Sequence, residues 1–304
     1  MSKRTWALLA ATFVSIIYGL TFTIAKDVMP RYIEPFGFIV IRVFGATVLF
    51  WLVSFFVRLL NFQKEVRNDK IAKEDFPRII AAAFFGVALN MLTFFKGLSY
   101  TSPIMSAVLM VTTPMIVLVL SAIIMKERMK KRKVFGIILG LAGTTSLILY
   151  GKSMINAPNA TLGNLLVFIN AVSYGFYLIV VKKLMDKYNA FTFVKWIYTF
   201  GFLMVLPFGW NEFHAINWTL IPIDIFWKIG FVILFSTFFT YLLNLLSMRE
   251  LKPTTVAVFI YLQPLFATIF AVSLGKDELS WVKLLSAILI FIGVYLVTMK
   301  IEKK

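Results

Sequence analysis

The 304-residue sequence contains no cysteine and only one histidine, His214. Without cysteine the chain has no disulfide, no thiolate nucleophile and no cysteine-ligated metal. A single histidine, which we expect in a loop over residues 211–225, argues against histidine-based catalysis or metal binding. We therefore expect no cofactor, no metal site and no catalytic residue, and the chain is not expected to be an enzyme.

Charged residues are also scarce, at 15% of the chain, whereas 60% of the residues are hydrophobic. Soluble domains are about half apolar and about a quarter charged. The apolar residues here form long runs without charge, namely 5–25, 99–125, 229–248 and 253–275. A membrane-spanning helix needs about 20 mainly apolar residues, and a β-barrel is disfavoured because the runs do not alternate. The composition therefore predicts an all-α membrane protein.

Ten such segments can be placed along the chain. We predict transmembrane helices over residues 6–26, 36–57, 78–98, 103–125, 134–151, 163–182, 193–210, 226–247, 253–274 and 282–299. Helices are expected because lipid offers no hydrogen-bond partner to an open backbone.

The basic residues indicate how the helices are oriented. Lysine and arginine together number 31 against 14 acidic residues, which gives a net charge of +17. Most of them fall at both termini and in alternate connections, and an excess of Lys and Arg marks the cytoplasmic side. Both termini are therefore expected in the cytoplasm, and the charge is attributed to membrane topology rather than to a nucleic-acid partner. The expected partners are the lipid bilayer and a small-molecule substrate.

The two halves of the sequence resemble each other. Tyr18-Gly19 matches Tyr174-Gly175 at an offset of 156 residues. At an offset of 150, Pro103, Ala107, Pro114 and Lys126 match Pro253, Ala257, Pro264 and Lys276, and Glu127 matches Glu278 after a shift of one residue. We predict repeats over residues 1–151 and 152–304. Because each has five spans, the second must enter the membrane from the opposite side, and such inverted repeats place a substrate site near the midplane.

These motifs resemble a known family. They are Lys96-Gly97-Leu98-Ser99-Tyr100-Thr101-Ser102-Pro103, then Thr113-Pro114, Lys126-Glu127-Arg128 and Gly136-x-x-x-Gly140-x-x-Gly143. Their order is similar to the EamA domain of the drug/metabolite transporter superfamily, with a weaker second copy in which Lys276-Asp277-Glu278 replaces the Lys-Glu-Arg pattern. The resemblance implies ten helices, a central cavity, and export of amino acids, other metabolites or drugs across a bacterial inner (plasma) membrane.

Polar and aromatic residues inside the spans are the candidates for lining that cavity and binding substrate. They are Tyr18, Arg42, Asn90, Lys96, Asn170, Tyr174, Tyr177, Asn244 and Gln263. Each has a simpler explanation: the two cations can reach the headgroups, the amides can bond helix to helix, and the tyrosines can pack. Pro114 and Pro264, at matched positions, are predicted to kink gating helices, although a static kink is the alternative.

Several functions remain open at this point. The leading hypothesis is secondary, non-ATP export of small metabolites such as amino acids by alternating access, either as uniport or as proton antiport, although few acidic residues are buried to relay protons. A drug exporter or a nucleotide-sugar or phosphate antiporter is an alternative, but few buried basic residues argue against strongly anionic substrates. A membrane-embedded enzyme or a channel is less well supported.

The chain is expected to be a monomer or a weak homodimer, because Gly136-x-x-x-Gly140 favours packing within the chain.

Overall fold

The computed structural model describes residues 2–59, 70–100, 106, 109–128, 130–149, 159–273 and 280–299, and all the regular elements among them are helices. Pro103, Ala107, Lys276 and Glu278, which support the sequence repeat, lie outside the described residues.

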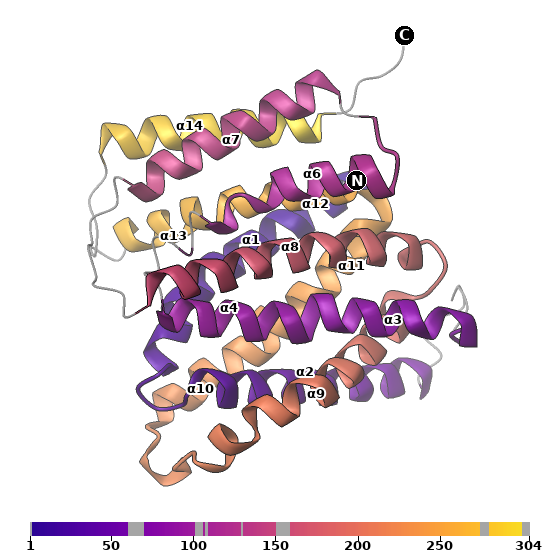
Figure 1. The fold of residues 1–304 in the computed structure, drawn as a ribbon, viewed down its shortest axis with the longest axis vertical. Coiled ribbons are helices and arrows are strands. Elements are labelled where there is room, and N and C mark those ends of the chain that lie inside the picture. Colours follow the sequence, from indigo (N-terminus) through magenta and orange to yellow (C-terminus); the bar gives the residue numbers. More distant parts are fainter. Residues whose placement is uncertain are drawn as a thin grey trace.

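The described helices join end to end into ten rods that run side by side (Figure 1). In the first repeat the first two rods are α1 (Lys3–Val28) and α2 (Pro35–Leu59). The third rod consists of four segments, η1 (Lys73–Asp75), α3 (Phe76–Ala83), η2 (Phe84–Ala88) and α4 (Leu89–Tyr100). The fourth and fifth rods are α6 (Thr113–Ile124) and α7 (Lys131–Leu149). In the second repeat the sixth and seventh rods are α8 (Ala160–Met185) and α9 (Ala190–His214). The eighth rod consists of α10 (Ile223–Phe231), η4 (Val232–Phe239) and α11 (Thr240–Glu250), and the ninth consists of α12 (Pro253–Val258), η5 (Phe259–Tyr261) and α13 (Leu262–Ser273). The tenth rod is α14 (Trp281–Thr298). A short 3-10 turn, η3 (Trp218–Leu220), precedes α10.

The packing partners of these rods reveal an inverted repeat. In the first repeat α1 packs against α11 and α13, and in the second its counterpart α8 packs against α4 and α6. The remaining helices pair with their own counterparts, α2 with α9 and α7 with α14, at opposite edges of the bundle (Figure 1). The prediction of ten helices in two inverted five-helix repeats is confirmed.

The irregular segments obey the same symmetry. The third rod contains the π-helical segment η2, and the eighth rod contains the π-helical segment η4. A turn at residues 111–112 precedes Pro114, and the 3-10 segment η5 precedes Pro264. Each proline stands within the first turn of the regular helix that follows, where its missing N–H leaves no bond unmade. Both pairs therefore interrupt equivalent rods in the two repeats.

Glycines bring α7 and α14 into close contact. A Cβ atom added at Gly136 would lie 2.8 Å from the carbonyl oxygen of Gly293, and one at Gly143 would lie 2.9 Å from that of Ser286. Small residues allow such an approach between helices in a membrane. The use of this glycine motif within the chain, as predicted, is confirmed.

The connection between α9 and α10 differs from the prediction. The loop expected over residues 211–225 begins later, because α9 continues to His214. The extra turn is stabilised by Glu212, whose Oε2 accepts hydrogen bonds from the backbone N–H groups of Phe36 (2.6 Å) and Gly37 (2.9 Å) at the start of α2. A carboxylate at a helix N-terminus satisfies free donors and the helix dipole. His214 therefore ends a helix, and the loop prediction was wrong for these residues.

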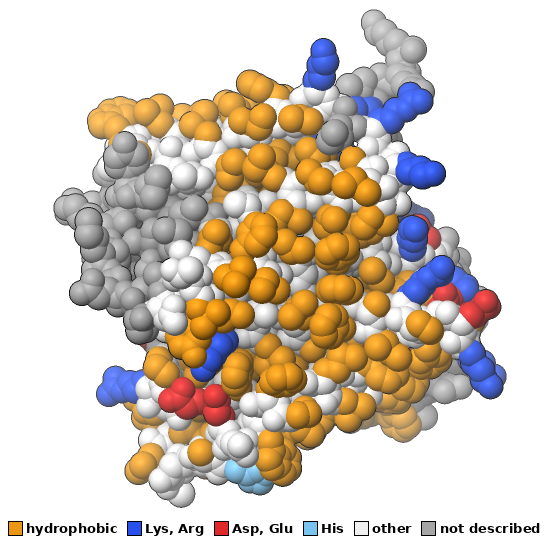
Figure 2. Space-filling view, viewed as in Figure 1, with side chains coloured by type: hydrophobic (Ala, Val, Ile, Leu, Met, Phe, Trp, Pro, Cys, Tyr) orange, Lys and Arg blue, Asp and Glu red, His pale blue; other side chains and the backbone are white. Residues whose placement is uncertain are grey.

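The surface matches a chain that crosses a membrane several times. Seven rods are long and apolar enough to span one, while α6 and residues 284–298 are shorter apolar helices. On the face shown in Figure 2, hydrophobic side chains cover the middle of the bundle, and Lys and Arg gather mainly at one end. That end holds both termini, because Arg4 donates to the carbonyl oxygen of Thr298 (2.5 Å). It is called the termini end below, and the opposite end is called the mouth end.

Candidate functional site

A cavity of about 390 Å³ lies between the two repeats. Its walls come from α1, α2, α4, α8, η4, α11, η5 and α13, so both halves contribute. The polar lining residues are Tyr18, Thr21, Arg42, Asn90, Ser99, Asn170, Tyr174, Ser236, Tyr241 and Gln263. The other lining residues are Ala25, Met29, Pro30, Pro35, Met91, Phe94, Phe95, Leu98, Met110 and Ile260.

The cavity extends toward the mouth end. Met29 and Pro30 belong to the connection between α1 and α2, and Ser99 lies at the last turn of α4, all at that end of the bundle. Tyr18 and Asn170 lie deeper, near the middle of their helices. The cavity therefore runs from the mouth end to the middle of the bundle.

Six of the nine predicted binding residues line this cavity. They are Tyr18, Arg42, Asn90, Asn170, Tyr174 and Gln263, which come from α1, α2, α4, α8 and α13. The two halves thus contribute polar side chains to one shared space, and the lining is otherwise apolar and aromatic. This composition is typical of small-molecule sites.

Arg42 is the charged group of the site. It is only 5% exposed, so its side chain does not reach the headgroups as the snorkelling explanation requires. Its Nε donates a hydrogen bond to Oγ1 of Thr237 (3.2 Å), and its Cζ lies 5.4 Å from the ring centroid of Phe95. The π-helical geometry of η4 helps to place Thr237, whose hydroxyl also donates to the carbonyl of Val232 five residues earlier (2.8 Å).

The amide and hydroxyl groups beside it are only partly paired. Asn170 donates from Nδ2 to the backbone oxygen of Asn90 (2.6 Å), while its Oδ1 has no partner among the described residues. The hydroxyl of Ser236 also has no hydrogen-bond partner among the described residues. Both residues are at most 2% exposed and both line the cavity. Buried polar atoms normally have partners, so these two are available to a bound molecule.

Three predicted residues do not line the cavity. The ammonium group of Lys96 lies over the rings of Phe36 (5.3 Å) and Tyr100 (4.9 Å) toward the mouth end. Tyr177 is 2% exposed and packs against Gly86, where an added Cβ would lie 2.2 Å from its ring. Asn244 is buried within α11 and is not among the lining residues. The structure thus does not place these three in the lining, and a part for them in substrate binding stays a prediction.

Hydroxyl residues of the sixth and eighth rods were missed in the sequence. Ser236 and Tyr241 line the cavity, and the hydroxyl of Tyr241 donates to the carbonyl oxygen of Gly86 (2.7 Å). Another hydroxyl, that of Ser173, donates to the carbonyl of Phe85 (2.7 Å). These bonds reach the carbonyls of the π-helical segment η2. Hydroxyls in otherwise apolar spans were the available signal, because membrane helices place them where a backbone group needs a partner.

Below the cavity the bundle is closed by packed aromatic rings. Tyr198 lies 5.0 Å from Phe50 and 5.0 Å from Tyr241, and Phe50 lies 4.6 Å from Phe238 (centroid distances). With the contact between Tyr177 and Gly86 they form the floor of the cavity. Such ring pairs stabilise a packed core beyond the area that they bury.

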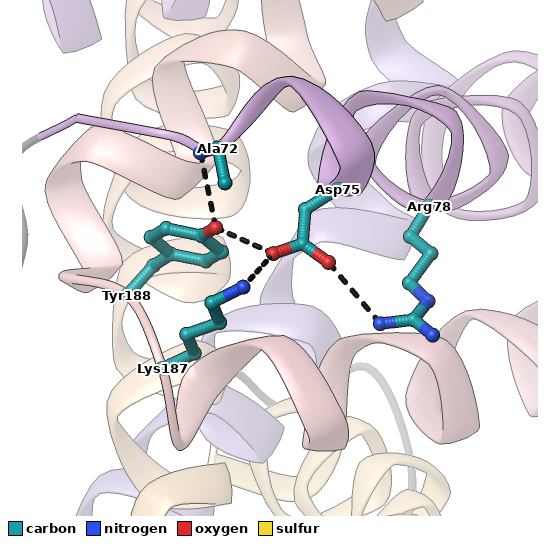
Figure 3. A network of polar contacts seen from close by, with 5 residues as sticks. All are labelled: Ala72, Asp75, Arg78, Lys187 and Tyr188. Carbon is teal, nitrogen blue, oxygen red and sulfur yellow. Dashed lines mark hydrogen bonds and ion pairs between the residues drawn. The ribbon is translucent and has the colours of Figure 1, made fainter.

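A network of polar contacts closes the termini end beyond this floor (Figure 3). Asp75, 3% exposed, accepts hydrogen bonds from Lys187 and from the hydroxyl of Tyr188 (2.5 Å), and it pairs with Arg78 (3.1 Å). The hydroxyl of Tyr188 also accepts from the backbone N–H of Ala72 (3.1 Å). The hydrogen bonds to Asp75 and Tyr188 raise the pKa of Lys187 above its ordinary value, because they stabilise the charged form of the lysine. These contacts, called the Asp75 network, join the third rod to the connection between α8 and α9, one from each repeat.

Other inter-repeat contacts reinforce the same end. Glu127 accepts from Lys133 (2.7 Å) and from Lys252 (3.2 Å), and Lys133 also donates to Thr254 (3.1 Å). Glu127 thus forms ion pairs with a lysine of each repeat. No cluster of three or more potential metal ligands occurs in the part of the chain that the structure describes.

Comparison with known proteins places this architecture among transporters. The EamA-like transporter family matches residues 5–149 and 161–299, one match in each half. The uncharacterized transporter YetK of Bacillus subtilis is 24% identical over 99% of this chain and 89% of its own length. An uncharacterized transporter of Archaeoglobus fulgidus is 26% identical over 98% of this chain and 99% of its own. A crystal structure with 15% identity superposes with a TM-score of 0.76 and covers 97% of both chains, which supports the fold.

Proposed function

The chain belongs to the EamA-like transporter family, and we propose that it is a secondary transporter that exports small metabolites such as amino acids by alternating access. It is a multi-pass membrane transporter rather than an enzyme. The substrate class, the export direction, the bacterial inner membrane as its location and the cytoplasmic position of both termini are parts of the proposal.

The observation that carries the proposal is a cavity that extends to one end of the bundle, while packed rings and ion pairs of described residues lie between it and the other end. Residues of both repeats line it, and it reaches the middle of the bundle. An aromatic floor and the Asp75 network close the termini end. Inverted repeats of this kind can exchange which end is closed, because each half can adopt the packing of the other. A channel would instead need a continuous path.

The distribution of Lys and Arg between the two ends supports the proposed topology. Lys and Arg gather at the termini end on the face shown in Figure 2, as expected for a cytoplasmic side. The cavity would then open to the outside in this conformation. For an exporter this is the state from which substrate leaves.

Counterflow in proteoliposomes tests the function. Vesicles loaded with unlabelled amino acid should accumulate the same labelled amino acid transiently if the protein is a carrier. The flux should saturate, and it should need no ATP. Unsaturable flux without counterflow would indicate a channel, and no flux with amino acids, other metabolites or cationic drugs would remove the transport proposal.

A further inference from the structure

The cavity contains one buried cation and no side chain of opposite charge. Arg42 is 5% exposed and lines the cavity, and none of the lining residues is Asp or Glu. In the sequence, none of the 14 acidic residues falls within the ten predicted spans. A buried ion without a counter-ion is costly, and intramembrane charges mark functional sites. The cavity therefore favours an anionic group on whatever it binds.

The hydrogen bonds of Arg42 leave most of its donors for a ligand. A guanidinium carries five N–H donors in a planar fork. In the described part of the chain only Nε is committed, to Thr237 at 3.2 Å, and the Phe95 ring lies beside the Cζ atom. The Thr237 bond and the ring hold the group in place. A fork held in this way matches the two oxygens of a carboxylate.

Two further buried polar atoms complete a binding site. The hydroxyl of Ser236, the residue before Thr237, can donate a second hydrogen bond to an anion, and it has no partner among the described residues. Oδ1 of Asn170 is likewise unpartnered, but it can only accept, so it suits a donor such as an ammonium or amide N–H. Both side chains are at least nine-tenths buried, and both line the cavity.

We propose that Arg42 binds a single carboxylate of the transported molecule, and that the substrates are small monoanions or zwitterions with an apolar or aromatic body. This inference rests on the proposed function, because it assigns a substrate class to the same cavity. Phe94, Phe95 and Met91 supply the apolar surface for the body of the molecule. A polyanion such as a nucleotide sugar would bring charges without partners, and a cation would face Arg42 without a carboxylate to offset the repulsion.

The test compares acids with their own carboxamides. Phenylalanine, leucine and 3-phenylpropionate, each beside its carboxamide, are titrated against the purified protein by thermal shift, in which a bound ligand raises the unfolding temperature. We expect each acid to bind at least about tenfold more tightly than its amide, since a charge-assisted pair is lost in the amide. Inorganic phosphate alone serves as the probe for a general anion site, and we expect it to give little protection.

Variants of the positioning residues then assign the effect to Arg42. Arg42→Gln should remove the preference for acids, whereas Arg42→Lys should keep part of it, because the charge remains but the fork is lost. Thr237→Val should weaken acid binding less than Arg42→Gln does. The matched control is Lys195→Gln. This lysine is also a cation within a span, but it lies over the Trp51 ring (4.8 Å) and does not line the cavity, so the preference should be unchanged.

The wild-type comparison of acid with amide decides the inference even if Arg42→Gln does not fold. Amides that bind as tightly as acids, acids that bind Arg42→Gln undiminished, protection by phosphate but by no acid, or no acid bound at all would each overturn it.

Counterflow separates this inference from the function. Flux of amides equal to that of acids leaves a transporter without a carboxylate site. Acid binding that depends on Arg42 but gives no flux leaves the site and removes the transport proposal.

Discussion

The two ends of the helix bundle are built from the same repeat but are closed by different contacts. At the mouth end the repeats meet at the bonds from Phe36 and Gly37 to Glu212 and at an ion pair between Lys228 and Asp27 (2.8 Å), and the cavity extends to that end. At the termini end they meet through the Asp75 network and the Glu127 ion pairs, below the aromatic floor. The termini end is therefore the one at which an acidic residue, Asp75, is buried.

This difference shows how a pseudo-symmetric protein becomes asymmetric in function. The repeats share helix pairings and irregular segments, but Asp75 is buried near the start of the third rod, whereas Asp224, near the start of the equivalent eighth rod, is exposed at the mouth end. Each polar contact at the closed end is modest in free energy, so the closure can reverse in each transport cycle. We expect substitutions to have progressively smaller effects in this order: the aromatic floor, the Asp75 network, the hinges at Pro114 and Pro264, and the mouth end.

The largest effect is expected in the floor of the cavity. In Gly86→Ala the new Cβ would lie 2.2 Å from the Tyr177 ring, and overpacking of this kind typically costs about 1–3 kcal/mol of folding free energy. The matched control is Gly230→Ala, because nothing lies within 4 Å of a Cβ at Gly230 and alanine favours helix. Unfolding in detergent compares the two variants. Equal stability of the two would contradict the close packing of the floor.

Loss of the Asp75 carboxylate is expected to weaken the termini end next. Asp75→Asn leaves Lys187 and Tyr188 without their anionic acceptor, and a lost bond to a charged group costs roughly 1.5–3 kcal/mol, less here because Lys187 is half exposed. The control is Asp224→Asn, which breaks an exposed pair with Lys228 (3.4 Å) at the mouth end and should change stability by less than about 1 kcal/mol. Thermal unfolding measures both. A larger loss from Asp224→Asn would reverse the comparison of the two ends.

The hinges should affect rate more than binding. Pro114→Ala combined with Pro264→Ala removes two proline rings, which oppose a continuous helix, just after the symmetry-related breaks at residues 111–112 and 259–261. Straighter helices should slow the exchange between the open states, so we expect a lower maximal counterflow rate with little change in ligand affinity. The single variants serve as controls for each repeat. An unaltered rate would identify the kinks as static.

The smallest effect is expected at the mouth. Lys96 lies over aromatic rings outside the cavity lining, so Lys96→Met should weaken transport of anionic or zwitterionic substrates mainly by slowing their entry. Lys96 is partly exposed, and steering by such a charge is screened by salt, so the difference from wild type should shrink as ionic strength rises. Uptake rates in low and high salt measure it. Unchanged transport in low salt would remove Lys96 from the mechanism.

The fold could be predicted from hydropathy and from the repeat, because both depend on spacing along the chain. The cavity could be predicted only in part. Polar residues in apolar spans are visible in the sequence, and Arg42 and Asn170 are examples that line the cavity. The rotation of each helix is not visible. Tyr174 faces the cavity, whereas Tyr177, one turn further along the same helix, faces Gly86. The π-helical segments η2 and η4 also change which side chains of their rods face the cavity, and no pattern in the sequence predicted these segments.

Reactivity of single cysteines at the two ends tests the central claim most directly. The chain has no native cysteine, so Ser99→Cys in the cavity near the mouth and Ser247→Cys, buried at the termini end, report without background. We predict that Asp75→Asn lowers the labelling rate of Ser99→Cys and raises that of Ser247→Cys. The account is contradicted if both rates move in the same direction, or if Ser247→Cys stays unreactive while the protein transports substrate.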